Sequence, residues 1–276
     1  MHVILNQCLR LHLGHSLAAA ALYCLLLLGV RSLCLLPLLA GLPPWGIALT
    51  AVLLAPVVGI FSCRLGYGLM VLTARLLEKK YVTLGYILIG FLKRSSAAAS
   101  RLDKAGYADG AAFLCRTGLC VLGICLSYGR FPPQFAPVPF VWAVLGCLCL
   151  SSLLSALWGI PFSYFFLILY DKPELAGRQA VRTGLSYTFG RFFHLLGFLL
   201  YAGGMDIVLL AVTLLLFCLF PKALLLQPSF RLMVAMLGMS CLLSALKVLV
   251  RFCFAFVIYY YSLTGVLHIH RTEEEA

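Results

Sequence analysis

The stretch DKPELAGRQAVRTGLSYTFGRFF, residues 171–193, is a basic segment that lies between two apolar ones, residues 158–170 and 194–210. The chain around it is very hydrophobic: of its 276 residues, 63% are hydrophobic and 11% are charged, and its mean hydropathy is +1.04. A soluble domain has about 25% charged residues. The composition therefore predicts a membrane protein along nearly its whole length, organised as a single integral membrane domain over residues 1–276.

Six apolar tracts divide the chain, and a spanning helix needs about 20 residues. The first, third and fifth tracts fit one crossing each, whereas the other three must tilt, kink or project beyond the hydrocarbon, with Pro56 and Pro161 as candidate kinks. The expected fold class is all-α: a polytopic membrane helix bundle of about six transmembrane helices with cytoplasmic amphipathic helices, one of them within residues 81–107. The tracts cover residues 16–39, 45–75, 111–128, 136–170, 193–220 and 232–263.

The basic segment has the pattern of a helix that lies on a membrane surface. Its apolar residues Val181, Leu185 and Phe189 recur every fourth position, and Arg178 and Arg182 are expected on the opposite side. Pro173 suits the first turn of this helix. We expect the apolar face to rest on the membrane while the arginines, including Arg191, reach lipid phosphates.

Lysine and arginine residues gather on one side of a six-span topology, and this bias predicts that both termini are cytoplasmic in a cell (inner) membrane. The formal net charge of +12 is then mostly a topology signal. The bases are dispersed among membrane flanks, which favours anionic lipid headgroups as partners and argues against nucleic acid. The cytoplasmic side has Arg10, Arg75, Lys79, Lys80, Lys93, Arg94, Arg101, Lys104, Lys172, Arg178, Arg182, Arg191 and Arg271, against Arg31, Arg130, Lys222 and Arg231 on the other.

The central block, residues 158–205, resembles the most characteristic part of a bacterial integral membrane family, catalogued as domain of unknown function nine hundred and seventy-five. More loosely, it is similar to the membrane domain attached to some glycerophosphodiester phosphodiesterases. The sequence GFLKR at residues 90–94 resembles the family's Gly-Phe-basic stretch, whereas Gly184 and Met205 depart from its pattern. The resemblance implies a six-helix membrane fold and names no reaction. It rests on Trp158, Ile160, Pro161, Ser163, Tyr164, Asp171, Pro173, Ala180, Gly190 and Gly204.

Three ionisable residues lie deep inside the last two tracts. Asp206 precedes the connection at residues 221–231 by 15 residues, and Lys247 follows it by 16, so antiparallel neighbouring helices bring the two charges to similar depth. Arg251 is one turn beyond Lys247. A single charge at the bilayer centre costs at least about 2.5–3.5 kcal/mol. We therefore expect an intramembrane cluster, which is either a structural pin, a transport or proton-relay site, or a group exposed to a wet cavity.

Signatures of catalysis and metal binding are absent from the sequence. There is no H-E-x-x-H, G-x-S-x-G or G-x-x-x-x-G-K motif, and the 12 cysteines form no C-x-x-C pair and behave as small apolar residues. His268 and His270 are too few ligands for a metal site. Arg64 and Arg116 are expected at the membrane interfaces, where long side chains reach the headgroups. No catalytic residue, metal or cofactor is predicted.

Two functions remain open. The first is a non-enzymatic membrane protein that organises lipids, or an unidentified membrane-protein partner, at the cytoplasmic membrane face. The alternative is a small permease or transporter subunit that uses Asp206 and Lys247. A polar cavity that reaches Asp206 favours the permease, and a sealed pair favours the pin.

Overall fold

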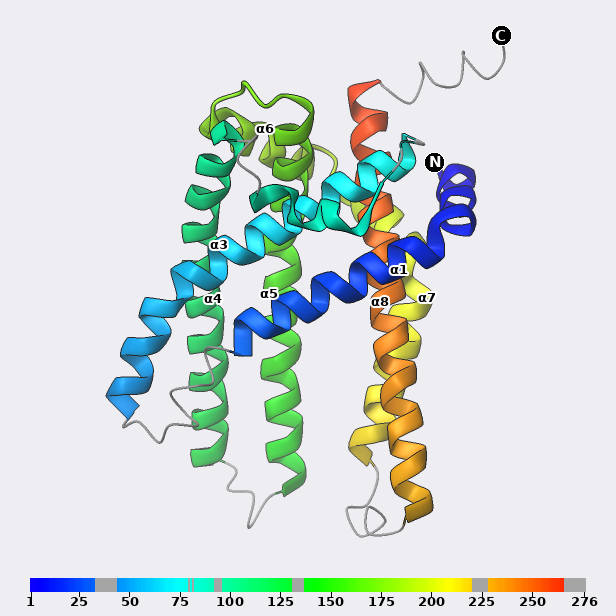
Figure 1. Ribbon diagram of the computed structural model, residues 1–276. Helices are drawn as coiled ribbons and strands as arrows, with labels where there is room; N and C mark the ends of the chain where they lie inside the picture. Colours follow the sequence, from blue (N-terminus) through cyan, green and yellow to red (C-terminus); the bar gives the residue numbers. More distant parts are fainter. Residues whose placement is uncertain are drawn as a thin grey trace. The chain divides into compact units, whose positions relative to one another are not determined.

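In the computed structural model, the described residues are 1–32, 44–78, 80, 82–91, 96–130, 137–219 and 228–265, and every regular element among them is a helix (Figure 1). The chain divides into two compact units, each made of several segments. Unit 1 comprises residues 1–23, 69–86 and 187–276, and unit 2 comprises residues 24–68 and 87–186. The helices are α1 (His2–Ser32), α3 (Pro44–Leu77), the 3-10 helix η2 (Leu84–Phe91), α4 (Ser96–Arg130), α5 (Pro137–Asp171), α6 (Gly177–Gly190), α7 (Phe192–Leu219) and α8 (Pro228–Thr264).

Three of these described helices contain a stretch that is long and apolar enough to cross a membrane: Val3–Val30, Leu49–Leu77 and Cys241–Thr264. A fourth crossing is possible where Gly177–Gly190 and Phe192–Val208 form one bent pair. The all-helical class predicted from the sequence is confirmed, and the three candidate spans are compatible with the predicted membrane character. That the chain has six spans, and that it forms a single domain, stay predictions.

The segment at residues 81–107, where an amphipathic element was expected, contains parts of two helices. It contains η2, and then α4 begins at Ser96, 15 residues before the third apolar tract. Two glycines explain how η2 lies so close to α3. A Cβ atom on Gly68 would lie 1.9 Å from the carbonyl oxygen of Ile87, and one on Gly90 would lie 2.6 Å from that of Arg64. Backbone therefore packs on backbone on the buried side of η2, whereas Leu84 and Leu88 are exposed. The place of this segment at a membrane surface stays a prediction.

In unit 2, α3 and α4 cross at three glycines. A Cβ atom on Gly59 would lie 2.1 Å from the carbonyl oxygen of Gly106, and one on Gly110 would lie 2.4 Å from that of Ala55. Small residues allow helix backbones to approach closely in membrane proteins. The helix α4 also lies along α5 (Figure 1).

In unit 1, α7 and α8 form an antiparallel hairpin (Figure 1). Gly203 of α7 faces the ring of Phe252, and Phe198 packs against Tyr259 with ring centroids 6.3 Å apart. The carboxyl-terminal part of α8 is the core of this unit, since residues 253–261 are all buried.

Candidate functional site

The basic surface helix α6 begins later than the sequence suggests. The chain leaves α5 through a turn in which the amide of Leu175 donates to the carbonyl of Lys172 at 3.2 Å. Pro173 lies inside this turn, four residues before the helix starts at Gly177. The prediction that Pro173 occupies the first helical turn is therefore wrong.

One stripe of α6 is buried and consists of small residues, Ala180, Gly184 and Thr188. The Cβ position of Gly184 lies 3.3 Å from the carbonyl oxygen of Pro161 and 3.4 Å from the amide nitrogen of Phe165, both in α5. The small side chains let α6 lie directly on α5. Consequently, the larger apolar residues of α6 are not the ones that pack on the protein.

The larger apolar residues of α6 form an exposed stripe, as predicted. Val181 and Leu185 are exposed, and Phe189 is 69% exposed. Arg178 and Arg182 are exposed too, but the prediction that they lie opposite this stripe is wrong. At 3.6 residues per turn, residues three and four apart share a helix face, so Arg178 neighbours Val181 and Arg182 neighbours Leu185. Arg178 therefore lies in line with the apolar stripe, one turn before Val181, and Arg182 lies at the edge of the stripe.

The carboxyl end of α6 adds a third exposed arginine. Arg191 occupies a break at which the chain bends by 77° between Gly177–Gly190 and Phe192–Val208. Phe193, just beyond the break, is 84% exposed. The surface of α6, defined here as Arg178, Val181, Arg182, Leu185 and Phe189, thus continues with a base and an aromatic ring.

The structure brings together part of the predicted cluster of Asp206, Lys247 and Arg251, between α7 and α8. Asp206 and Arg251 form an ion pair at 2.9 Å, and their side chains are 18% and 37% exposed. Arg251 also donates to the carbonyl oxygen of Ala202 at 3.1 Å. The Asp206 contact is ionic and not a well-aligned hydrogen bond, because its buried Oδ2 accepts none of good geometry from the described residues. Lys247 forms no ion pair within the part of the chain that the structure describes.

The helix register explains this choice of partner. Gly203 meets the ring of Phe252, which places Arg251 beside Ala202, one turn before Asp206. The long arginine side chain bridges that turn. Residue counting thus placed Lys247 and Arg251 together as partners of Asp206, and the structure pairs Asp206 with Arg251.

A second ion pair, absent from the sequence interpretation, joins α3 to α4. Arg64 donates from Nε to Oδ1 and from Nη2 to Oδ2 of Asp103, both at 2.8 Å, and its guanidinium lies 5.4 Å from the ring centroid of Phe91. Two parallel bonds of this kind are the strongest form of a carboxylate–arginine contact. Arg64 is thus paired inside unit 2, and its expected place at a membrane interface stays a prediction.

A third pair lies one to two turns further along α4. Arg116 approaches Asp109 at 3.6 Å, and the indole nitrogen of Trp158 in α5 donates to the same carboxylate at 3.2 Å. Asp109 therefore connects α4 with α5. The signal that could have indicated both pairs was the pair of acids just before the third apolar tract.

In unit 1, Glu78 connects the end of α3 with α8. The hydroxyl of Tyr261 donates to Glu78, and Lys80 pairs with it at 2.6 Å. Partial burial by itself raises the pKa of Glu78, but the hydrogen bonds from Lys80 and Tyr261 and the charges of Lys80 and Arg75 outweigh burial, so its pKa lies below the ordinary value. Arg75 itself donates to the Tyr86 hydroxyl at 2.7 Å.

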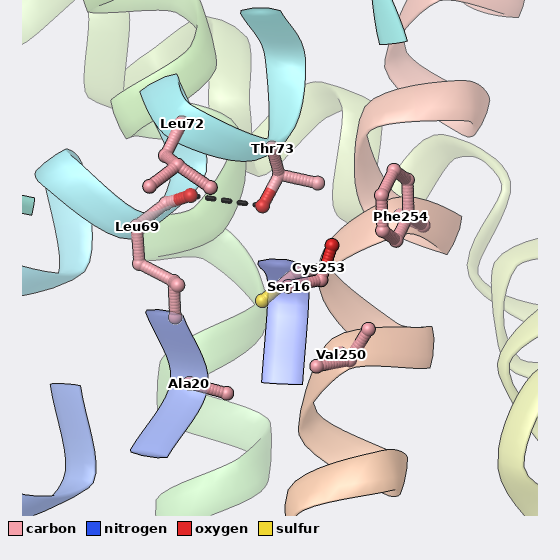
Figure 2. Close-up of a pocket in the computed structure, with 8 residues that line it drawn as sticks. All are labelled: Ser16, Ala20, Leu69, Leu72, Thr73, Val250, Cys253 and Phe254. Atoms are coloured by element: carbon pink, nitrogen blue, oxygen red, sulfur yellow. Dashed lines mark hydrogen bonds between the residues drawn. The ribbon is translucent and has the colours of Figure 1, made fainter. Parts of the chain in front are cut away.

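Unit 1 contains a small pocket, and Figure 2 shows its lining from α1, α3 and α8. It is mostly apolar, and its size suits about one water molecule. The Thr73 hydroxyl donates to the Leu69 carbonyl at 2.9 Å, as the dashed line marks. Asp206 does not line this pocket, so the pocket is not evidence for a transport path. The lining residues are Ser16, Ala20, Leu69, Leu72, Thr73, Val250, Cys253 and Phe254.

Within the described ranges, no three histidine, cysteine or acidic side chains gather as a metal site, and His268 and His270 lie outside those ranges. The resemblance to the bacterial membrane family remains a prediction. Compared with protein-family models, with curated proteins and with solved structures, the chain matches none of them.

Proposed function

We propose that this chain is a non-enzymatic multi-pass membrane protein that holds anionic lipid headgroups at the cytoplasmic membrane face through α6. The observation that carries the proposal is the surface of α6, in which Arg178 lies in line with an exposed apolar stripe and Arg182 lies at its edge. An amphipathic helix with this composition lies in the interface, with its apolar residues 5–10 Å deep at the boundary of headgroups and acyl chains, as a rough general depth.

The three sides of α6 suit that position. The small buried stripe packs on the protein, the stripe of Val181, Leu185 and Phe189 faces lipid, and the polar side with Gln179 and Ser186 faces water. The long side chains of Arg178 and Arg182 reach from the lipid side to the phosphate layer while the helix axis stays at its depth. The 77° break at Arg191 allows α6 to lie flat while the next helix enters the membrane.

The topology that goes with this proposal has six spans in the cell (inner) membrane. Both termini lie on its cytoplasmic side. The lysine and arginine asymmetry supports it. Reporter fusions after Ala276 and within residues 129–134 test it. An active periplasmic-type reporter after Ala276 would reverse the orientation and place α6 on the outer face.

Lipid retention tests the binding itself. The purified protein is placed in nanodiscs of phosphatidylcholine with a minority of phosphatidylglycerol, and the lipids that stay bound after extraction are counted by native mass spectrometry. Each base near an anionic surface contributes about 1 kcal/mol. The double variant Arg178→Gln with Arg182→Gln should therefore lower the preference for phosphatidylglycerol roughly 30-fold.

The matched control removes the same charge elsewhere. Arg10→Gln with Lys104→Gln takes two exposed bases from α1 and α4. It should leave the preference almost unchanged. Equal losses in the two double variants would mean that total charge, and not α6, attracts the lipid.

A permease remains the second candidate, carried by the Asp206–Arg251 pair between α7 and α8. Replacing both charges by leucine separates the two proposals. A structural pin predicts a stable protein that keeps its lipid preference and complements a deletion strain. A permease predicts a stable protein that fails to complement, because the polar step in its path is lost.

A further inference from the structure

Arg101 of α4 is a basic residue whose contacts the lipid proposal leaves unused. Its Nη1 donates to the carbonyl oxygen of Pro173, and its Nη2 donates to that of Glu174 at 3.4 Å. Both acceptors belong to the turn between α5 and α6. The charge of Arg101 is therefore directed at backbone oxygens and not at lipid phosphates.

The stem of Arg101 also covers the first residue of α6. A Cβ atom on Gly177 would lie 3.5 Å from Cγ of Arg101, at ordinary contact distance. One side chain thus contacts three of the five positions from Pro173 to Gly177. It holds the turn and the start of the helix together.

We infer that Arg101 is a positioning residue for α6, and that it fixes the rotation at which Arg178 and Arg182 meet the phosphate layer. The inference rests on the proposed lipid-binding function. Gly184 anchors the middle of α6 on α5 through close backbone contacts, in which no side chain of its own interlocks with α5. A second anchor at the amino end is what sets the orientation of the exposed stripe, and Arg101 is that anchor.

The chemistry of the contact requires arginine. Its planar fork presents two donors that reach two successive carbonyls at once, whereas a lysine ammonium is a compact point charge on a flexible stem. Arg101→Lys keeps the charge but loses the fork. This difference separates positioning from simple attraction of anionic lipid.

The experiment compares Arg101→Gln, Arg101→Lys and Lys104→Gln in the full-length protein in the same nanodiscs. Lys104 lies on the same helix, is exposed, and loses the same charge. Two quantities are measured: the preference for phosphatidylglycerol, and the rate of hydrogen–deuterium exchange over residues 172–190.

Arg101→Gln should lower the lipid preference at least about fivefold, the equivalent of one lost base, and should speed exchange in residues 172–190 but not in α8. Arg101→Lys should give an intermediate loss, and Lys104→Gln should change neither quantity.

Two outcomes would overturn the inference. A loss of lipid preference without faster exchange would make Arg101 a direct lipid ligand. Matching behaviour of Arg101→Gln and Lys104→Gln would leave Arg101 with no special role. Failure of the proposed function is recognised separately, because the Arg178 and Arg182 variant would then keep its lipid preference.

Discussion

The α3–α4 crossing of unit 2 and the α7–α8 hairpin of unit 1 solve the same problem by different means. In the crossing, glycines bring two backbones together, and the charged partners Arg64 and Asp103 meet in parallel hydrogen bonds at 2.8 Å. In the hairpin, Gly203 meets a ring, and Asp206 and Arg251 meet in a contact of poorer hydrogen-bond geometry.

The two contacts differ in whether the atoms opposite the glycine can move aside for an added side chain. A phenylalanine ring can rotate away from an added methyl group, but a carbonyl oxygen in a helix cannot. The crossing should therefore be intolerant of added volume. The hairpin should tolerate volume better and depend more on its single charge pair.

The largest expected effect is overpacking of the crossing. Gly106→Ala places a Cβ 2.5 Å from Cα of Ile60 and should destabilise the protein by about 3 kcal/mol or prevent folding. Gly203→Ala, with a Cβ 2.8 Å from the Phe252 ring edge, should cost about 1 kcal/mol. Thermal unfolding of both variants in detergent measures this, with Gly118→Ala as the open-space control in α4. Similar losses for Gly106→Ala and Gly203→Ala would remove the contrast.

The next effect concerns the hairpin charges. Asp206→Asn leaves Arg251 unpaired in an apolar environment and should cost about 2–3 kcal/mol. The double change Asp206→Leu with Arg251→Leu should recover most of this, because apolar replacement of both members of a buried pair is often neutral. Asp206→Leu with Lys247→Leu should not recover it. Equal rescue by both double variants would show that Lys247 shares the pair.

A smaller effect is the pH dependence of unit 1 through Glu78. Its pKa is lowered in the folded state, so its contribution to stability is present above the unfolded pKa, near 4.5, and is lost as pH falls through the folded value. The melting temperature should therefore fall more steeply below pH 4.5 in the native protein than in Glu78→Gln. Parallel pH profiles for the two proteins would contradict the assignment.

Much of the hairpin was predictable, because counting residues from the connection places Asp206 and the basic residues of α8 at one depth. The identity of the partner was not, since a one-turn choice between Lys247 and Arg251 depends on how Gly203 meets Phe252. Helix register is set by such contacts and not by hydropathy.

The crossing was not predictable from hydropathy. Asp103 and Asp109 make the first part of α4 polar, so the apolar tract starts 15 residues after the helix does. The partners Arg64 and Asp103 are 39 residues apart, and nothing local connects them. The spacing of the apolar residues in α6 was predicted correctly. The helix face on which its arginines lie has to be found by counting turns. Its buried stripe of small residues has no hydropathy signal.

The most direct test of the central claim identifies which molecules surround Phe189, whose side chain is 69% exposed on α6. A photo-crosslinking benzoylphenylalanine is placed at position 189, and at Gln179 as the control on the polar side, in the full-length protein in nanodiscs that contain phosphatidylglycerol. The account predicts that position 189 crosslinks to lipid acyl chains and that position 179 does not, with the lipid adduct at 189 reduced in the Arg178→Gln, Arg182→Gln background. Crosslinking of position 189 to protein alone, or equal lipid adducts at both positions, would contradict it.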